Sequence, residues 1–261
     1  MGLDIRDFNM DFFSLAGKNA IITGGNSGLG QGYALALAKA GANIFCVSLA
    51  DDSGETKEMI EAEGVKFHLM LGDISKDGEC KRIADECVHV FDSIDILVNN
   101  AGICLMEGDV TKFDRKLWDK MMDINLTAAF ELSHEVAKYM IPQQSGKIIN
   151  ICSLFSFLGG QWSPAYAASK AGLMGFTKAY CDELAQFGIQ VNGIAPGYYA
   201  TPITAQTRAN EETNQRVLSH IPAGRWGEIQ DLMGATVFLA SQASNYVNGT
   251  LLTVDGGYLV R

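Results

Sequence analysis

NAIITGGNSGLGQGYALALAKAG, residues 19–41, begins the pattern on which the whole chain is built. It contains a short β-rich run (19–23), a glycine-rich turn (24–30) and an apolar helical pattern (31–41). A strand that leads through glycines into a helix is an arrangement that binds phosphate. Backbone N–H groups can approach the ligand closely, and the helix N-terminus adds partial positive charge. The stretch therefore predicts a dinucleotide site.

Apolar runs and helical patterns alternate along the rest of the chain. Strands are expected at 42–49, 66–71, 94–98, 147–151, 189–194 and 251–254, and helices at about 53–62, before 91, from 117, after 164 to about 187, and at 229–240. No repeat, low-complexity tract or linker divides the chain. The pattern predicts an α/β fold: a single-domain, Rossmann-like, doubly wound parallel sheet over residues 1–261, with helices on both faces. Residues 198–225 lack a strong period and are expected to form a substrate lid.

Composition narrows the expected partners. The chain has 261 residues and a formal net charge of −10, which disfavours nucleic acid and anionic membranes and leaves a small-molecule substrate. Six scattered cysteines, with no CxxC pair and no histidine at ligand spacing, indicate reduced thiols and no metal site. The start lacks the features of a signal peptide, and no run approaches the roughly 20 apolar residues of a membrane span. A cytoplasmic location is therefore expected.

A second informative pattern is SLFSFLGGQWSPAYAASK, residues 153–170. If a helix begins just after Pro164, Tyr166 and Lys170 share one face of it, because they lie four residues apart. A neighbouring cation favours phenolate, so the pair predicts a tyrosine whose pKa is lowered toward the range of acid–base catalysis. Ser153 could hydrogen-bond a substrate oxygen near that phenol. Alone, a YxxxK pair more often belongs to an exposed helix face, so its interpretation depends on the other motifs.

The strand ends predict which dinucleotide binds. The strand at 42–49 ends in Ser48, and Asp51 and Asp52 follow with no arginine or lysine beside them. Two carboxylates would repel a ribose 2′-phosphate, so NAD is expected and NADP is less favoured. Asp73 is expected to reach the adenine or to cap the helix that follows. The small residues of NNAG, 99–102, suit close passage of a cofactor at a strand's carboxyl end.

In this order and spacing, the motifs resemble those of the short-chain dehydrogenase/reductase family. The resemblance rests on TGGNSGLG (23–30), NNAG (99–102), INL (124–126), the Ser153, Tyr166 and Lys170 set, and APGYYAT (195–201). It implies hydride transfer between C4 of a nicotinamide and a carbonyl carbon, and a homotetramer with two-fold interfaces. IPAGRWGEIQDLMGATVFLAS (221–241) further resembles the members of the family that act on sugar acids.

The resemblance implies a role for each site residue. Tyr166 would donate the proton as the substrate oxygen becomes an alcohol, and Ser153 would hold that oxygen. Lys170 would hold the nicotinamide ribose and lower the pKa of Tyr166, while Asn125 would fix a water that leads protons to Lys170. The cofactor contacts expected are Thr23, Gly24, Asn26, Ser27, Gly28, Leu29, Gly30, Ser48, Leu49, Asp73, Ile74, Asn100, Ala101, Gly102, Tyr166, Lys170, Pro196, Gly197 and Thr201.

This sequence differs from the sugar-acid members at two positions beside the site, and the difference leaves more than one class of substrate to consider. Those members tend to carry arginines soon after NNAG and before the catalytic tyrosine, where a substrate carboxylate could be clamped. This chain has Ile103-Cys104-Leu105-Met106 and Gln161-Trp162 there, and Arg208 and Arg225 remain as candidates. The first expectation is a sugar acid resembling 2-keto-3-deoxy-gluconate. A neutral ketose, a polyol or another alicyclic ketone is the alternative, and a non-catalytic dinucleotide-binding protein is the most remote one.

Overall fold

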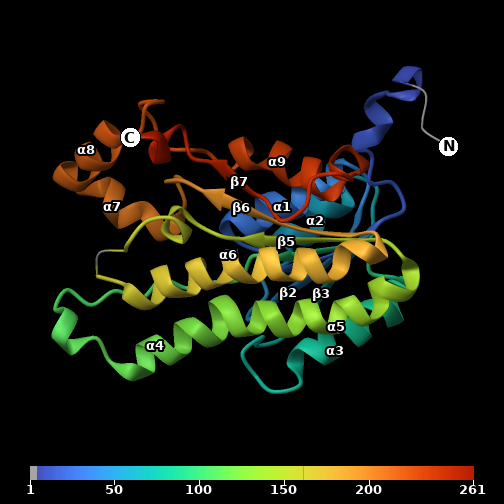
Figure 1. Cartoon of the computed structure of the whole chain (residues 1–261), viewed down its shortest axis with the longest axis horizontal. Helices are drawn as coiled ribbons and strands as arrows, with labels where there is room; N and C mark the ends of the chain where they lie inside the picture. The colour runs from blue at the N-terminus through green and yellow to red at the C-terminus, as the bar shows by residue number, and fades with distance from the viewer. Residues whose placement is uncertain (1–4, 161) are drawn as a thin grey trace.

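A seven-stranded parallel sheet forms the centre of the molecule in the computed structural model, which describes residues 5–160 and 162–261. The strands lie in the order β3-β2-β1-β4-β5-β6-β7, and β5, β6 and β7 are labelled as neighbours in Figure 1. Their bounds are β1 Asn19–Thr23, β2 Asn43–Ser48, β3 Phe67–Leu71, β4 Ile96–Asn99, β5 Gly146–Ile151, β6 Ile189–Pro196 and β7 Leu251–Val254. The predicted fold class is confirmed.

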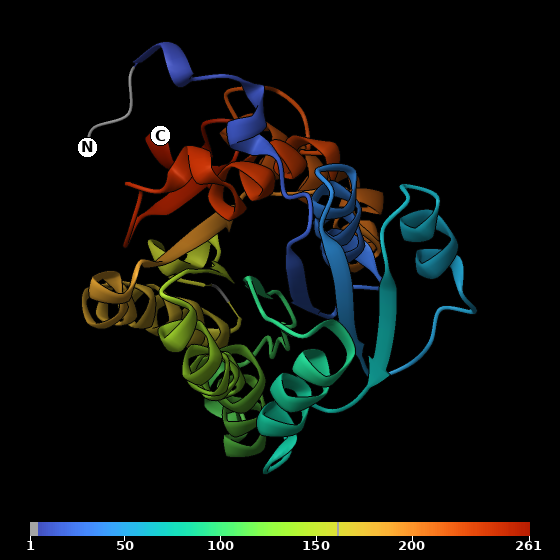
Figure 2. The ribbon, with the colours of Figure 1, turned by 90° about the vertical axis from the view of Figure 1, so that its right-hand side faces the viewer.

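Helices cover both faces of this sheet (Figure 2). They are α1 Gly28–Lys39, α2 Glu55–Glu61, α3 Glu79–Phe91, α4 Arg115–Met122, α5 Ala128–Gln143, α6 Pro164–Leu184, α7 Ala205–Ala209, α8 Glu211–His220 and α9 Gln230–Ala240. Short 3-10 turns lie at Ile5–Asp7, Met10–Phe13, Val110–Lys112, Leu154–Ser156, Ala185–Phe187, Pro202–Thr204, Gln242–Ser244 and Tyr258–Val260.

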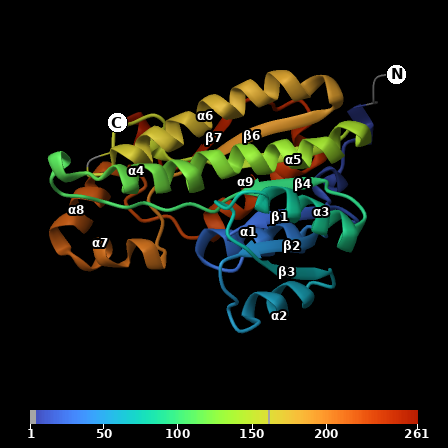
Figure 3. The same ribbon diagram turned by 90° about the horizontal axis from the view of Figure 1, so that it is seen from below.

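Successive side chains of each strand point to opposite faces of the sheet, so the core is divided into two layers. In β1, Ala20 and Ile22 pack against α1 and α9, whereas Ile21 packs into the layer formed with α3, α5 and the end of α6. Buried residues on both sides of one strand are typical of a parallel sheet covered by helices on each face. Figure 3 views the strands side by side, from β6 and β7 next to α6 at one edge of the sheet to β3 next to α2 at the other.

The chain order reverses direction across the sheet between β1 and β4. Strands β2 and β3 extend to one side of β1, and β4 to β7 extend to the other. Register pairs Thr23 with Val47 and Ile22 with Val98, so the turns that follow these strands start at nearly the same level. Such a reversal opens a crevice at the carboxyl ends of the strands, where open α/β sheets bind ligands.

Three sequence expectations were wrong in detail. The long helix expected from Leu117 begins slightly earlier, at Arg115, and continues through α4 and α5 with an unexpected π-helical turn at Asp123–Thr127 between them. The segment expected to be an irregular lid contains α7 and α8, whose short lengths hide their period. Helix α1 begins at Gly28, not at 31, so the last glycines of the motif belong to its first turn.

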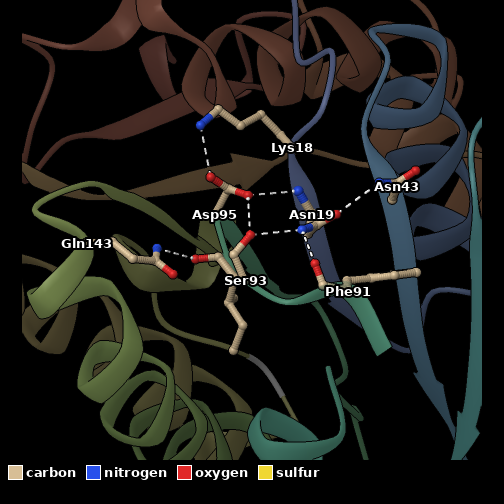
Figure 4. Close-up of polar contacts among 8 residues, drawn as sticks. Lys18, Asn19, Asn43, Phe91, Ser93, Asp95 and Gln143 are labelled. Carbon is tan, nitrogen blue, oxygen red and sulfur yellow. Dashed lines mark hydrogen bonds and ion pairs between the residues drawn. The ribbon is translucent and has the colours of Figure 1, made fainter. Parts of the chain in front are cut away.

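A buried polar cluster fixes the sheet at the edge opposite the crevice (Figure 4). The Asn19 side chain donates to the Phe91 carbonyl at 2.9 Å and to the Ser93 hydroxyl at 2.8 Å, and its oxygen accepts from Asn43 at 2.9 Å. The Asn19 backbone N–H donates to Asp95 at 3.0 Å. One side chain thus links the starts of β1 and β2 with the loop that enters β4.

Asn19→Ala should lower the free energy of unfolding by about 2–3 kcal/mol, because it leaves buried polar partners without hydrogen bonds. Lys18→Ala is the matched control. It removes an ion pair between Asp95 and a lysine side chain that is 46% exposed, so it should cost less than about 1 kcal/mol. Urea unfolding of both variants measures the difference, and equal losses would contradict this account of the cluster.

Candidate functional site

A cavity of about 710 Å³ lies at the carboxyl ends of the strands, over the point where the strand order reverses. It is lined by the glycine turn after β1, the end of β2, the turns after β3 and β4, the end of β5 and the segment after β6. Every residue that the sequence predicted to contact cofactor borders this cavity, with the exception of Thr23. Of the four predicted catalytic residues, Ser153, Tyr166 and Lys170 border it as well, and Asn125 lies just behind its wall.

The glycine turn fits a pyrophosphate. A Cβ on Gly30 would lie 2.0 Å from the Gly24 carbonyl oxygen, so no larger residue fits there, and Gly28 has a positive φ of +53°. A Cβ at Gly28 would meet nothing within 4 Å, because this residue faces open space. Ser27 precedes α1 in an extended conformation, and its side chain does not cap the helix. The first N–H groups of α1 therefore remain available to an anion in the cavity.

Thr23 and Asn100 join the turns after β1 and β4. The Thr23 hydroxyl accepts from the N–H groups of Asn100 and Ala101 at 3.0 and 2.9 Å. The Asn100 side chain donates to the Thr23 carbonyl at 2.8 Å. Thr23 is buried beneath the cavity floor, so it supports the floor without bordering the cavity.

The end of the cavity beyond β2 is acidic. Burial opposes ionisation of Asp52, but hydrogen bonds from the Thr56 hydroxyl and N–H lower the pKa of this carboxyl overall. Hydrogen bonds from Ser75 lower the pKa of Asp73 as well. Asp51 borders the same region. Within residues 5–160 and 162–261, Lys170 is the only lysine or arginine that borders the cavity, so this end has no cation to receive a phosphate.

One of the two alternatives for Asp73 was wrong. Its carboxylate accepts from Ser75 and closes a short turn, and α3 begins only at Glu79, after a left-handed Gly78. Asp73 therefore does not cap that helix. It borders the cavity, as the other alternative requires.

Lys170 is held at the inner end of the cavity. Only 4% of its surface is exposed, and its Nζ donates to the Ile151 carbonyl at 2.7 Å and lies 5.8 Å from the centre of the Tyr166 ring. Helix α6 begins at Pro164, as expected, and presents Tyr166 and Lys170 from one face. Ser153 follows β5, and its hydroxyl accepts from the Phe155 N–H at 3.2 Å.

The expected lowering of the Tyr166 pKa was wrong for this environment. Burial raises the pKa of Tyr166 to about 12, and the hydrogen bond with Ser153 only partly opposes that rise. Burial also lowers the pKa of Lys170. Desolvation is the stronger effect because the ammonium is engaged by the Ile151 carbonyl rather than by the phenol oxygen. Tyr166 is therefore a protonated phenol at neutral pH, which suits the donation of a proton.

Asn125 ties the π-helical turn to the loop after β4. Its side chain accepts from the Ile103 N–H at 2.8 Å and donates to the Ile103 carbonyl at 2.9 Å and to Ser169 at 3.2 Å. A Cβ on Gly102 would lie 3.2 Å from the Asn125 Oδ1 and 3.5 Å from the Lys170 Nζ. The two side chains therefore converge on Gly102.

The expected apolar wall is smaller than the sequence suggested. Cys104 borders the cavity, but Leu105, Met106 and Trp162 do not. Trp162 has a positive φ of +65° and is 45% exposed, and its carbonyl accepts from the Glu107 N–H at 2.9 Å. This hydrogen bond joins the loop that follows β4 to the segment that precedes α6, and Trp162 remains partly exposed there. Gln161, the other residue of that expectation, lies outside the described residues.

Both arginine candidates are engaged elsewhere. Arg208 donates to the Thr201 carbonyl at 3.1 Å and so fixes the start of the lid. Arg225 forms two hydrogen bonds with the Asp231 carboxylate, at 2.7 and 2.9 Å. Neither borders the cavity.

Sequence reasoning missed a group of residues that line the cavity through their position beside a motif. They are Val47, Ala50, Gly72, Ile124, Ile151, Cys152, Tyr199, Pro202 and Thr204. Most are apolar neighbours of predicted residues, and their only available signal was adjacency to a strand end.

Across the described ranges, no helix has both the length and the apolar character of a membrane span.

Three comparisons with known proteins agree with this geometry. A family model described as enoyl-(acyl carrier protein) reductase matches residues 24–259. The chain is 70% identical over 257 residues to the uncharacterized oxidoreductase YgcW of Escherichia coli (strain K12), covering 98% of each chain. It is 48% identical over 250 residues to 2-dehydro-3-deoxy-D-gluconate 5-dehydrogenase of the same organism, covering 95% of this chain and 98% of that one.

A solved structure supports the same relationship. The crystal structure of a putative 2-deoxy-D-gluconate 3-dehydrogenase from Agrobacterium tumefaciens, with bound NADP, matches with a TM-score of 0.89 and 43% identity, over 95% of this chain and 99% of that chain. Since both the family model and these relatives extend over nearly the whole chain, the protein belongs to the short-chain dehydrogenase/reductase family and is a nicotinamide-dependent oxidoreductase.

Proposed function

We propose that the protein interconverts a ketone and a secondary alcohol on a sugar acid resembling 2-keto-3-deoxy-gluconate, with NAD(H) as cofactor. The observation that carries the proposal is the convergence of Ser153, Tyr166 and Lys170 at the inner end of a dinucleotide-sized cavity. The names of the E. coli and A. tumefaciens relatives support a sugar acid as the substrate class.

Proton transfer in this proposal follows from the environment of Tyr166. A bound reduced nicotinamide supplies the hydride from C4. Tyr166, protonated at neutral pH because it is buried, donates its proton to the substrate oxygen as that oxygen becomes an alcohol. Ser153 holds the same oxygen, and its interaction with the phenol keeps the two hydroxyls together. Lys170 holds the nicotinamide ribose, and Asn125 positions a water beside it.

The preference for NAD rests on charge at the adenosine end. Asp51 and Asp52 border that region, and Asp52 is kept ionised by Thr56. Leu49, 77% exposed, stands directly after Ser48, where a cation would be needed to pair with a 2′-phosphate. The NADP found in the A. tumefaciens relative belongs to that protein. In this chain the local charge opposes a further phosphate.

We also propose that the protein is a cytoplasmic homotetramer. An aromatic cluster of Phe130, His134, Phe176 and Tyr180 lies on α5 and α6, with ring centres 4.4 to 6.3 Å apart. Phe130 is 44% exposed in the single chain, and exposed aromatic clusters of this kind are common at subunit contacts. This cluster supports one of the two-fold interfaces.

A neutral ketose or polyol is the second candidate substrate. It is favoured by the absence of any arginine, in the described part of the chain, at the border of the cavity. A panel of sugar acids, ketoses and polyols with NADH and NADPH separates the two candidates. Turnover restricted to neutral compounds would refute the sugar-acid proposal.

Tyr166→Phe should lower the turnover number by about 10²–10⁴-fold, because it removes the proton donor. NADH affinity should stay within about twofold, since the ring itself remains. Tyr246→Phe, at a fully exposed tyrosine, is the control and should leave both unchanged. Steady-state kinetics and NADH fluorescence titration measure these effects. Activity of the Tyr166 variant within a few-fold of wild type would refute the assigned role.

Leu49→Arg should raise the ratio of kcat/KM for NADPH over NADH by at least about tenfold, because a guanidinium would pair with the 2′-phosphate. Leu49→Gln, with similar loss of apolar surface but no charge, should leave that ratio near the wild-type value. If the wild-type enzyme itself uses NADPH more efficiently than NADH, the NAD proposal is wrong.

Phe130→Asp should shift the protein from tetramer to dimer, since a buried carboxylate without a partner is costly at an apolar interface. Lys57→Asp, on the exposed side of α2, is the control and should remain tetrameric. Mass photometry at nanomolar concentration measures both. Wild-type protein that is only monomeric would refute the homotetramer.

A further inference from the structure

The cavity lacks a cation where a substrate carboxylate would bind. Lys170 is its only positive side chain among the described residues, and the proposed chemistry commits that lysine to the nicotinamide ribose. Arg208 and Arg225 are engaged by the Thr201 carbonyl and by Asp231. A sugar acid would therefore need a positive charge from a segment above the cavity.

Helix α8 belongs to the lid segment, whose earlier residues Thr201, Pro202 and Thr204 border the cavity. Figures 1 and 3 place α7 and α8 at the same end of the molecule as the starts of α4 and α6. Val217 is buried and anchors the helix to the protein. Arg216 lies beside Val217 and one turn before His220, so Arg216 and His220 share a face of α8.

That face of α8 packs toward the cavity through a chain of aromatic rings. The His220 ring lies 4.3 Å from the Tyr258 ring, and Tyr258 lies 5.2 Å from Tyr198. Tyr198 directly follows Gly197, which borders the cavity. The contacts orient the Arg216 face of the helix toward the segment that leaves β6.

Tyr198 interacts electrostatically both with Arg216 of α8 and with Cys104 of the cavity wall. Burial and the neighbouring Tyr258 raise the pKa of Tyr198 to about 12, the positive charge of Arg216 opposes the rise, and the Cys104 thiol adds to it. Tyr198 thus interacts with α8 on one side and with Cys104, a residue of the cavity wall, on the other. A substrate that extends out of the cavity past Cys104 would approach Tyr198 and, beyond it, α8.

The Arg216 guanidinium is free to bind a ligand. In the ranges that the structure describes, the Arg216 side chain has no hydrogen bond and no ion pair, although Arg115, Arg208 and Arg225 each have a partner. A guanidinium can form two parallel hydrogen bonds with a carboxylate.

We propose that Arg216 of α8 is the specificity-determining residue that binds the carboxylate of the substrate. The proposal rests on the proposed sugar-acid function and supplies the positive charge that the border of the cavity lacks. Recognition from the lid also couples substrate charge to closure, since the carboxylate would hold α8 over the cavity.

Two matched ketones test the proposal. 5-Keto-D-gluconate and L-sorbose carry the same hydroxyl pattern around the ketone and differ in having a carboxylate or a hydroxymethyl group at the far end. Arg216→Gln should raise the KM for 5-keto-D-gluconate by at least about tenfold, as expected for a lost charge-assisted pair. The kcat/KM for L-sorbose should stay within twofold, and Arg216→Lys should fall between. Arg115→Gln, an equal charge change near the same end, is the control and should affect neither substrate.

Direct binding of D-gluconate to the enzyme with NADH, followed by tryptophan fluorescence, gives a readout independent of turnover. D-Gluconate binding that is weaker by at least about tenfold in Arg216→Gln supports the proposal. If the wild-type protein shows this binding but turns over no sugar acid, only the proposed function is refuted. Turnover of 5-keto-D-gluconate with an unchanged KM in Arg216→Gln would overturn the role of Arg216 and keep the proposed function. Equal losses for both ketones, or wild-type protein that does not bind D-gluconate, would overturn the role of Arg216.

Discussion

The close approach of the turns after β1 and β4 is the constraint on which the site depends. A Cβ on Gly30 would lie 2.0 Å from the Gly24 oxygen and 2.5 Å from the Asn100 amide nitrogen, so the first turn of α1 fits against both turns only without a side chain. Thr23 completes the contact by accepting two backbone N–H groups from the β4 turn. These contacts close the bottom of the crevice and keep the N-terminus of α1 facing into it.

Burial has opposite consequences for the two partners of the YxxxK motif. It raises the pKa of Tyr166 and lowers that of Lys170, so both groups are shifted toward their neutral forms. A simple count of charges on a helix face predicts the reverse for the tyrosine. The Ile151 carbonyl explains the difference, because it accepts from the ammonium and keeps it beside the ring rather than at the phenol oxygen. The Tyr166 phenol therefore stays protonated at neutral pH.

Much of the fold and most of the site could be predicted from the sequence, because strand ends and glycine turns have local signatures. Gly30 is required by a contact within its own turn, and Tyr166 and Lys170 by helical spacing. The π-helical turn at Asn125 could not be predicted, since it arises from contacts with Ile103 and Ser169, which are distant in sequence. Trp162 was misplaced for a similar reason: its backbone carbonyl accepts a hydrogen bond from the N–H of Glu107, which lies in another loop.

The lid differs from the rest of the chain in the structures that hold its residues in place. The residues proposed to carry the reaction follow the end of β5 or lie on one face of α6, whereas α7 and α8 are short. Helix α8 packs through rings such as His220 on Tyr258. Short helices have weak periodic signals, so sequence patterns identify the reaction well and the substrate poorly. The charge distribution agrees with this division. Carboxylates border the proposed cofactor end, the single lysine among the described residues of the cavity border is buried, and the arginine that we propose for the substrate carboxylate belongs to α8. If Arg216 binds the substrate carboxylate as proposed, changing this one lid residue alters which ketone is accepted without disturbing the groups proposed to transfer the proton.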